Sequence, residues 1–133
     1  MTKEDKELLL KDLCARLPYR VKAKYYDPEA ERTTCDEIDD VYCTTSIHNV
    51  EIGIGQYGLH LTEVKPYLFP MSSMTEEQCE ELYAISEVQL TFTPDIRIKV
   101  YKNTIEWFLK NHIDYNGLIE KGLAIDATGL NIY

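Results

Sequence analysis

The sequence has few residues that break regular structure and no long apolar run. Its 133 residues include six glycines and five prolines, too few for a collagen-like or low-complexity protein. The longest stretch without a charged residue, Ile52–Thr62, has 11 residues, whereas a helix needs about 20 residues to span a bilayer. Because 44% of the residues are hydrophobic, we expect residues 1–133 to form a single domain with its own core and no membrane partner.

The pattern of a secretory signal is also missing. Residues 1–6 carry charges of both signs, and the apolar run nearest to them, Leu8–Leu10, is shorter than a signal peptide requires. Cys14 and Cys79 fall on the predicted apolar faces of two helices. We therefore predict a cytoplasmic protein whose cysteines are reduced and buried.

Basic residues are scarce in the middle of the chain. Residues 33–96 contain twelve acidic residues and one basic residue, Lys65, whereas residues 1–32 and 97–133 each have a net charge of +1. Binding to nucleic acid needs a basic groove that contacts phosphates, and this charge distribution predicts no direct nucleic-acid binding. It favours a function in which this protein binds another protein. An alternative function is that of an acidic inhibitor, which would imitate nucleic acid and occupy the basic groove of an enzyme.

Gly53, Gly55 and Gly58 match the spacing of the dinucleotide-binding fingerprint. That site needs a helix that begins at the third glycine. Gly58 is instead followed by residues 59–62, which alternate in polarity like a strand. We therefore interpret the three glycines as part of a β-hairpin and predict no cofactor.

Thiol and imidazole groups are spread along the chain. No two cysteines stand two to four residues apart, and Cys43 with His48 has no second ligand pair nearby, so we predict no metal site. A cysteine nucleophile needs a base within hydrogen-bond reach. Because His48 or His60 can approach Cys43 across adjacent strands, a small cysteine/histidine-dependent enzyme remains an alternative function.

The hydrophobic pattern predicts a mostly β segment at residues 19–70 and a mostly α segment at residues 75–133. Short strands are expected at residues 19–26, 41–47, 50–54, 57–62 and 88–92, and a single helical turn at residues 64–68. The polar residues 29–40 suit an exposed loop or a weak hairpin. These strands predict a small, bent antiparallel sheet or a half-open β-barrel.

Helices are expected at both ends of this β segment. Thr2 with Asp5 and Thr75 with Gln78 have the spacing of N-terminal capping boxes. The first helix has the apolar stripe Leu10, Leu13, Cys14 and Leu17, and later helices are expected at residues 75–85, near 105–112 and near 118–123. Residues 96–101 fit a strand and a helix equally. The predicted class is α+β, with a leading helix and two or three C-terminal helices.

Acidic and aromatic residues are the candidate binding groups. Ten tyrosines are unusual for this length, and tyrosine suits both small cores and protein interfaces. The residues that we expect to contact a partner are Tyr57, Tyr67, Phe69, Trp107, Asp36, Glu37, Asp39 and Asp40. We therefore predict a non-catalytic module that binds another protein through an acidic, tyrosine-rich surface.

Two blocks of sequence resemble segments of a known group of proteins. Residues 60–78, HLTEVKPYLFPMSSMTEEQ, and residues 114–126, DYNGLIEKGLAID, are similar to small uncharacterised proteins of gut Bacteroidetes and of their phages and mobile elements. The resemblance is looser over the first helix and strand and hardly extends to residues 27–40. It implies an intracellular protein of bacterial or phage origin, and it assigns no catalytic or ligand residues.

Overall fold

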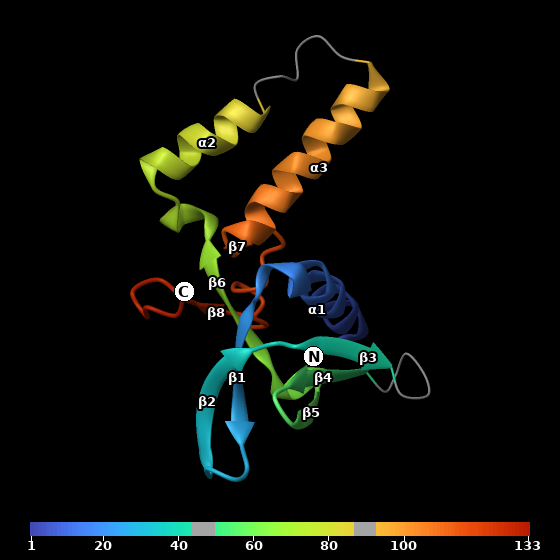
Figure 1. Ribbon diagram of the computed structural model, residues 1–133, viewed down its shortest axis with the longest axis vertical. Coiled ribbons are helices and arrows are strands. Elements are labelled where there is room, and N and C mark those ends of the chain that lie inside the picture. Colours follow the sequence, from blue (N-terminus) through green and yellow to red (C-terminus); the bar gives the residue numbers. More distant parts are fainter. Residues whose placement is uncertain (44–49, 87–92) are drawn as a thin grey trace.

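The protein has an α+β fold with two open, bent sheets (Figure 1). The computed structural model describes residues 1–43, 50–86 and 93–133, without the side chain of Cys43. The described residues form three α-helices and eight strands, which confirms the predicted class. The strand predicted at residues 88–92 and the second half of the one predicted at 41–47 lie outside the described residues.

Six strands lie between the first two α-helices along the chain, and two short strands follow the third. The elements are α1 (Lys3–Arg16), β1 (Lys22–Asp27), β2 (Arg32–Glu37), β3 (Asp40–Cys43), β4 (Val50–Ile54), β5 (Tyr57–His60), β6 (Lys65–Pro70), α2 (Glu76–Ser86), α3 (Pro94–Lys110), β7 (Ile113–Asp114) and β8 (Ile125–Asp126). Short 3-10 turns are η1 (Leu17–Tyr19), η2 (Leu61–Glu63) and η3 (Met71–Ser73). None of the helices described has both the length and the apolar composition needed to cross a membrane.

Helix α1 begins with the predicted capping box. The Asp5 amide donates to Thr2 Oγ1 at 3.1 Å, and the Thr2 amide donates to Asp5 Oδ2 at 3.4 Å. The buried stripe is Leu9, Asp12, Leu13 and Arg16, one residue away from the predicted one. This shift brings two charged side chains into the core. It also leaves Cys14 exposed, and Cys79 on α2 is exposed too, so the prediction of buried thiols was wrong for both.

The larger sheet has the order β2-β1-β6-β7, and β8 also pairs with β6. Strand β1 is antiparallel to β2 and to β6, whereas β7 and β8 are parallel to β6. Val21, Ala23 and Tyr25 alternate into the core as predicted. Residues 29–40, expected as an exposed loop or a weak hairpin, form no hairpin of their own: residues 32–37 are β2, which pairs with β1 across a turn at residues 28–31.

Strand β6 replaces the single helical turn predicted at residues 64–68. Proline lacks an N–H donor and restricts the preceding residue to extended conformations. Pro66 and Pro70 therefore favour an extended segment, and Leu68 between them is fully buried. Both the N-terminal hairpin and the C-terminal strands pair with β6, which makes it the central strand of the larger sheet.

The smaller sheet has the order β3-β4-β5 and is antiparallel throughout. One face of β4 presents Val50, Ile52 and Ile54 to the core that also contains Leu9 and Leu13 of α1. Successive residues of a strand point to opposite faces. Glu51 and Gly53 therefore lie on the outer face, away from α1.

Helices α2 and α3 lie side by side and project away from the sheets (Figure 1). Thr75 and Gln78 form the predicted capping box, with amide-to-side-chain bonds of 3.0 and 3.1 Å. Residues 96–101 are helical because Pro94 opens α3 in its first turn, where a missing N–H costs nothing. The short helix predicted near residues 118–123 is absent from the structure of that segment, which consists of turns with Gly122 left-handed at φ 72°.

Candidate functional site

The outer face of the smaller sheet gathers acidic and aromatic side chains. In its register, Tyr42 is paired with Glu51, and Glu51 with His60. In the same sheet Asp40 is paired with Gly53. Partners that lie directly opposite each other in antiparallel strands share a face. We call Asp40, Tyr42, Glu51 and His60 the acidic sheet face; strands β3, β4 and β5 contain no lysine or arginine.

The glycines make room for the side chains of this face. A Cβ atom at Gly53 would collide with Asp40 Oδ1. At Gly58 it would lie 2.8 Å from Glu51 Oε2 and 2.9 Å from the Tyr42 hydroxyl. The carboxylates and the phenol therefore lie flat over glycine backbone, in positions that a larger residue would block.

The predicted hairpin at the glycine motif is confirmed, since β4 and β5 pair on either side of residues 55–56. Gly55 has φ 57°, a left-handed conformation that suits glycine. Its amide donates to Asp39 Oδ2 at 2.6 Å. Asp39 therefore stabilises the β4–β5 turn. The formation of this turn explains the glycine motif without a role in nucleotide binding.

The phenol of Tyr42 interacts electrostatically with the carboxylates of the acidic sheet face. The hydrogen bond from the Tyr42 hydroxyl to Glu51 raises the pKa of Tyr42, and burial and the charges of Glu51 and Asp40 act in the same direction. The phenol therefore stays protonated and donates to a carboxylate. Tyr42 is 41% exposed, so its ring is accessible beside two acidic groups.

The four acidic residues that were predicted to contact a partner lie at three separate places in the fold. Asp36 is exposed on β2, opposite Ala23 of β1. Glu37 accepts a hydrogen bond from Arg20 Nε at 3.1 Å in an exposed ion pair, which has little effect on stability. Asp39 and Asp40 lie beside the smaller sheet. Of the four residues, these two are the ones that the fold brings to the glycine hairpin.

The four predicted aromatic residues are all partly or largely packed. The Tyr57 hydroxyl donates to Asp27 Oδ1 at 2.9 Å, and Phe69 packs on Tyr133 with ring centroids 6.0 Å apart. Tyr67 is half-buried on β6. Trp107 is 8% exposed, and its indole N–H donates to Glu81 at 3.2 Å.

Other tyrosines are more exposed than the predicted ones. They are Tyr26, Tyr42, Tyr83, Tyr101 and Tyr133. Tyr42 was missed because its position beside Glu51 depends on strand register. The glycine hairpin sets which residues of β4 and β5 face each other, Glu51 and His60 among them, but it does not set the register of β3 against β4 that places Tyr42.

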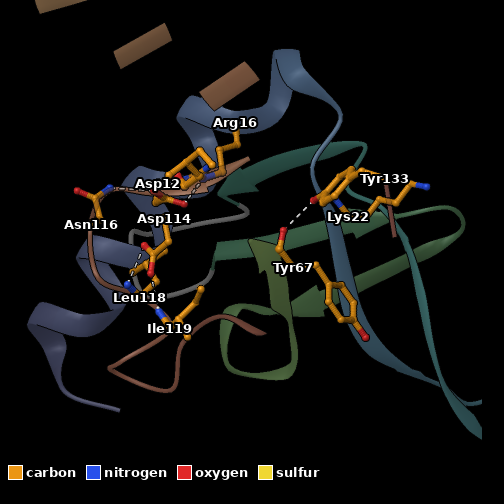
Figure 2. Close-up of polar contacts among 10 residues, drawn as sticks. Asp12, Arg16, Lys22, Tyr67, Asp114, Asn116, Leu118, Ile119 and Tyr133 are labelled. Carbon is orange, nitrogen blue, oxygen red and sulfur yellow. Dashed lines mark hydrogen bonds and ion pairs between the residues drawn. The ribbon is translucent and has the colours of Figure 1, made fainter. Parts of the chain in front are cut away.

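A second polar cluster lies inside the protein (Figure 2). Arg16 Nε donates to Asp12 Oδ2 at 2.6 Å, and Asn116 donates to Asp12 Oδ1 at 2.8 Å. Asp114 accepts hydrogen bonds from the amides of Leu118 and Ile119, both at 2.9 Å. The bond from Asn116 joins α1 to the segment after α3, and the bonds to Asp114 close a turn within that segment. The burial of these groups indicates a structural role.

The cysteine/histidine alternative depends on groups outside the described part of the chain, namely His48 and the side chain of Cys43. His60 lies at the end of β5 and its amide donates to Glu63 Oε2 at 2.7 Å. Within residues 1–43, 50–86 and 93–133, no three histidine, cysteine or acidic residues gather into a group that could hold a metal ion.

No family model matches the chain, and no curated protein or solved structure is significantly similar to it. Its function is therefore inferred from its own residues.

Proposed function

We propose that the protein is a non-catalytic binding module whose acidic sheet face holds a basic surface of another protein. One observation carries the proposal: Asp40, Tyr42 and Glu51 stand together on the outer face of a sheet whose three strands contain no lysine or arginine. Paired strands fix the spacing of the two carboxylates. A rigid acidic surface attracts and orients a basic partner through complementary charge.

The chemistry of this face favours arginine on the partner. Guanidinium groups bind carboxylates through paired hydrogen bonds and also stack on aromatic rings. Glu51 and Asp40 supply carboxylates, and Tyr42, whose ring is exposed, lies opposite Glu51 and two residues from Asp40 on β3. Tyrosine and arginine are also the residues that contribute most to binding energy at protein interfaces.

We further propose that this binding takes place in the cytoplasm. Cys79 is exposed on α2, and an exposed thiol persists in a reducing compartment. A bacterial or phage origin, implied by the resemblance of residues 60–78 and 114–126, agrees with this location.

The test is capture from a bacterial lysate with two charge-matched variants. The double variant Asp40→Asn/Glu51→Gln removes two charges from the acidic sheet face without changing side-chain shape. The control Glu76→Gln/Glu80→Gln removes two charges from α2, where both residues are exposed. We expect a partner that the wild type and the α2 control retain, that the sheet variant loses, and that added salt releases.

Two outcomes would contradict the proposal. One is capture that both variants retain equally, and the other is no salt-sensitive partner for the wild type. If the captured protein is an enzyme that binds nucleic acid, a competition assay with its substrate follows. Mutual exclusion would identify the acidic sheet face as an imitation of nucleic acid.

A further inference from the structure

A pocket of about 470 Å³ lies between α1 and the end of the smaller sheet. Pockets that bind small molecules have volumes of about 300–1,000 Å³. Three of its lining residues are apolar: Leu10 from α1, Val50 from β4 and Leu61 from η2. Val50 and Leu61 also belong to the buried core, so the packing of the protein holds this apolar floor in place.

Charged residues from the first two turns of α1 line the same pocket. They are Lys3, Lys6 and Glu7. Lys3 Nζ lies 3.7 Å from Glu7 Oε1 in an exposed ion pair. Among the described residues Lys6 forms no ion pair, so its ammonium group is available to a ligand.

We propose that this pocket binds a small amphiphile with one carboxylate. The apolar body of the ligand lies on Leu10, Val50 and Leu61, and its carboxylate pairs with the ammonium group of Lys6. Burial of apolar surface supplies most of the binding energy. The pairing with Lys6 selects an anion over a cation, and the carboxylate of Glu7 disfavours a second negative charge on the ligand.

This site adds a second binding activity to the proposed function. It shares His60 with the acidic sheet face, but the lysine that we propose to hold the ligand is separate from the residues that we propose to hold the partner. Lys6 lies on α1, whereas Asp40, Tyr42 and Glu51 lie on β3 and β4. Substitutions at Lys6 therefore leave the acidic sheet face intact. Failure of one proposal can be distinguished from failure of the other.

The probes are octanoate, 1-octanol and octylammonium, which share one apolar chain and differ in charge. Binding is followed by NMR through the backbone amides of the wild-type protein. We expect octanoate to shift the signals of Leu10, Val50 and Leu61. Its dissociation constant should be lower than that of octylammonium by about tenfold, a difference of about 1.4 kcal/mol that combines attraction of the carboxylate by Lys6 with repulsion of the ammonium group.

Two lysines of α1 provide a matched pair of variants. Lys6→Glu reverses the charge at the pocket, whereas Lys11→Glu reverses it at an exposed position of the same helix that does not line the pocket. We expect Lys6→Glu to weaken octanoate binding about tenfold while 1-octanol binding is unchanged. Lys11→Glu should bind all three probes like the wild type. Glu7→Gln should bind octanoate more tightly, because it removes a like charge.

Three results would overturn the proposal. The first is no binding of octanoate to the wild type, or shifts confined to residues away from the pocket. The second is equal affinity for octanoate and octylammonium. The third is an equal effect of Lys6→Glu and Lys11→Glu, with both variants shown by circular dichroism to be folded.

Discussion

Asp12 and Arg16 form an ion pair inside the protein, one helical turn apart on α1, and neither side chain is exposed. Arg16 Nη2 also donates to the carbonyl oxygen of Ile113 at 2.8 Å, across 97 positions of sequence. The guanidinium group lies 5.6 Å from the ring centroid of Tyr115. The pair therefore fastens the first helix to the segment that follows α3.

Asp12→Leu should destabilise the protein strongly. The substitution leaves Arg16 buried without a counter-charge, and removal of one partner of a buried ion pair costs about 3–5 kcal/mol. The double variant Asp12→Leu/Arg16→Met should recover most of the loss, because it removes both charges and keeps apolar volume. Urea unfolding measures the free energies. A double variant as unstable as the single one would contradict this account.

Asp114→Ala should cost about 1–3 kcal/mol, since it leaves two amide donors without their acceptor. Asp114 is 7% exposed and accepts from Leu118 and Ile119. The control is Asp126→Ala, which removes an exposed carboxylate that accepts from the Thr128 amide. Denaturant unfolding should show a clearly smaller loss for the control, and equal losses would refute the importance of the buried acceptor.

Tyr133→Phe should cost about 1–2 kcal/mol, because two hydrogen bonds are lost. Although the residue is 41% exposed, its hydroxyl donates to the Tyr67 carbonyl at 2.8 Å and accepts from the Lys22 amide at 3.0 Å. Burial raises the pKa of Tyr133 to about 12, so both bonds persist at neutral pH. Tyr101→Phe, at a residue 70% exposed, should leave the melting temperature unchanged.

His112 should make stability depend on pH. Its ring stacks on Tyr133 with centroids 3.7 Å apart, and Nδ1 is buried and has no hydrogen-bond partner among the residues that the structure describes. Burial, with smaller effects from Arg16 and Lys22, lowers the pKa of His112 from 6.5 to about 4. The folded protein therefore favours the neutral ring, whereas the unfolded chain takes up a proton below pH 6.5. Stability should be full above pH 6.5 and decline as the pH falls toward 4.

The variant His112→Asn isolates this contribution. Asparagine tolerates the left-handed φ of 57° at this position and does not titrate. The free energy of unfolding, measured between pH 4 and 8, should fall more steeply in the wild type than in the variant below pH 6.5. A difference between the two proteins that is constant over this range would contradict the assignment.

The capping boxes and the alternating strand at Val21–Tyr25 could be predicted because their signals are local. The buried face of α1 could not. Leu8, Leu9 and Leu10 are consecutive, so the apolar pattern allows stripes that differ by one residue. The true stripe includes Asp12 and Arg16, which a count of apolar residues assigns to solvent.

The other differences between the predicted and the observed secondary structure result from pairing between segments that are distant in the sequence. Strands β7 and β8 have two residues each, too few to show a period, and they exist through their parallel pairing with β6. At the acidic sheet face, Asp39 and Asp40 could be predicted as exposed acids. Tyr42 could not be placed beside Glu51, because strand register is decided by the turn and by the buried face of β4.

The hydrogen bond between Arg16 and Ile113 has a consequence for folding during synthesis on the ribosome. Arg16 is synthesised 97 residues before Ile113, so the charged pair of α1 stays hydrated while the residues between them are being made. This contact between α1 and the segment after α3 can therefore form only after Ile113 has been made. Shortened products that stop before Ile113 would expose a charged, apolar helix to the chaperones and proteases of the cell.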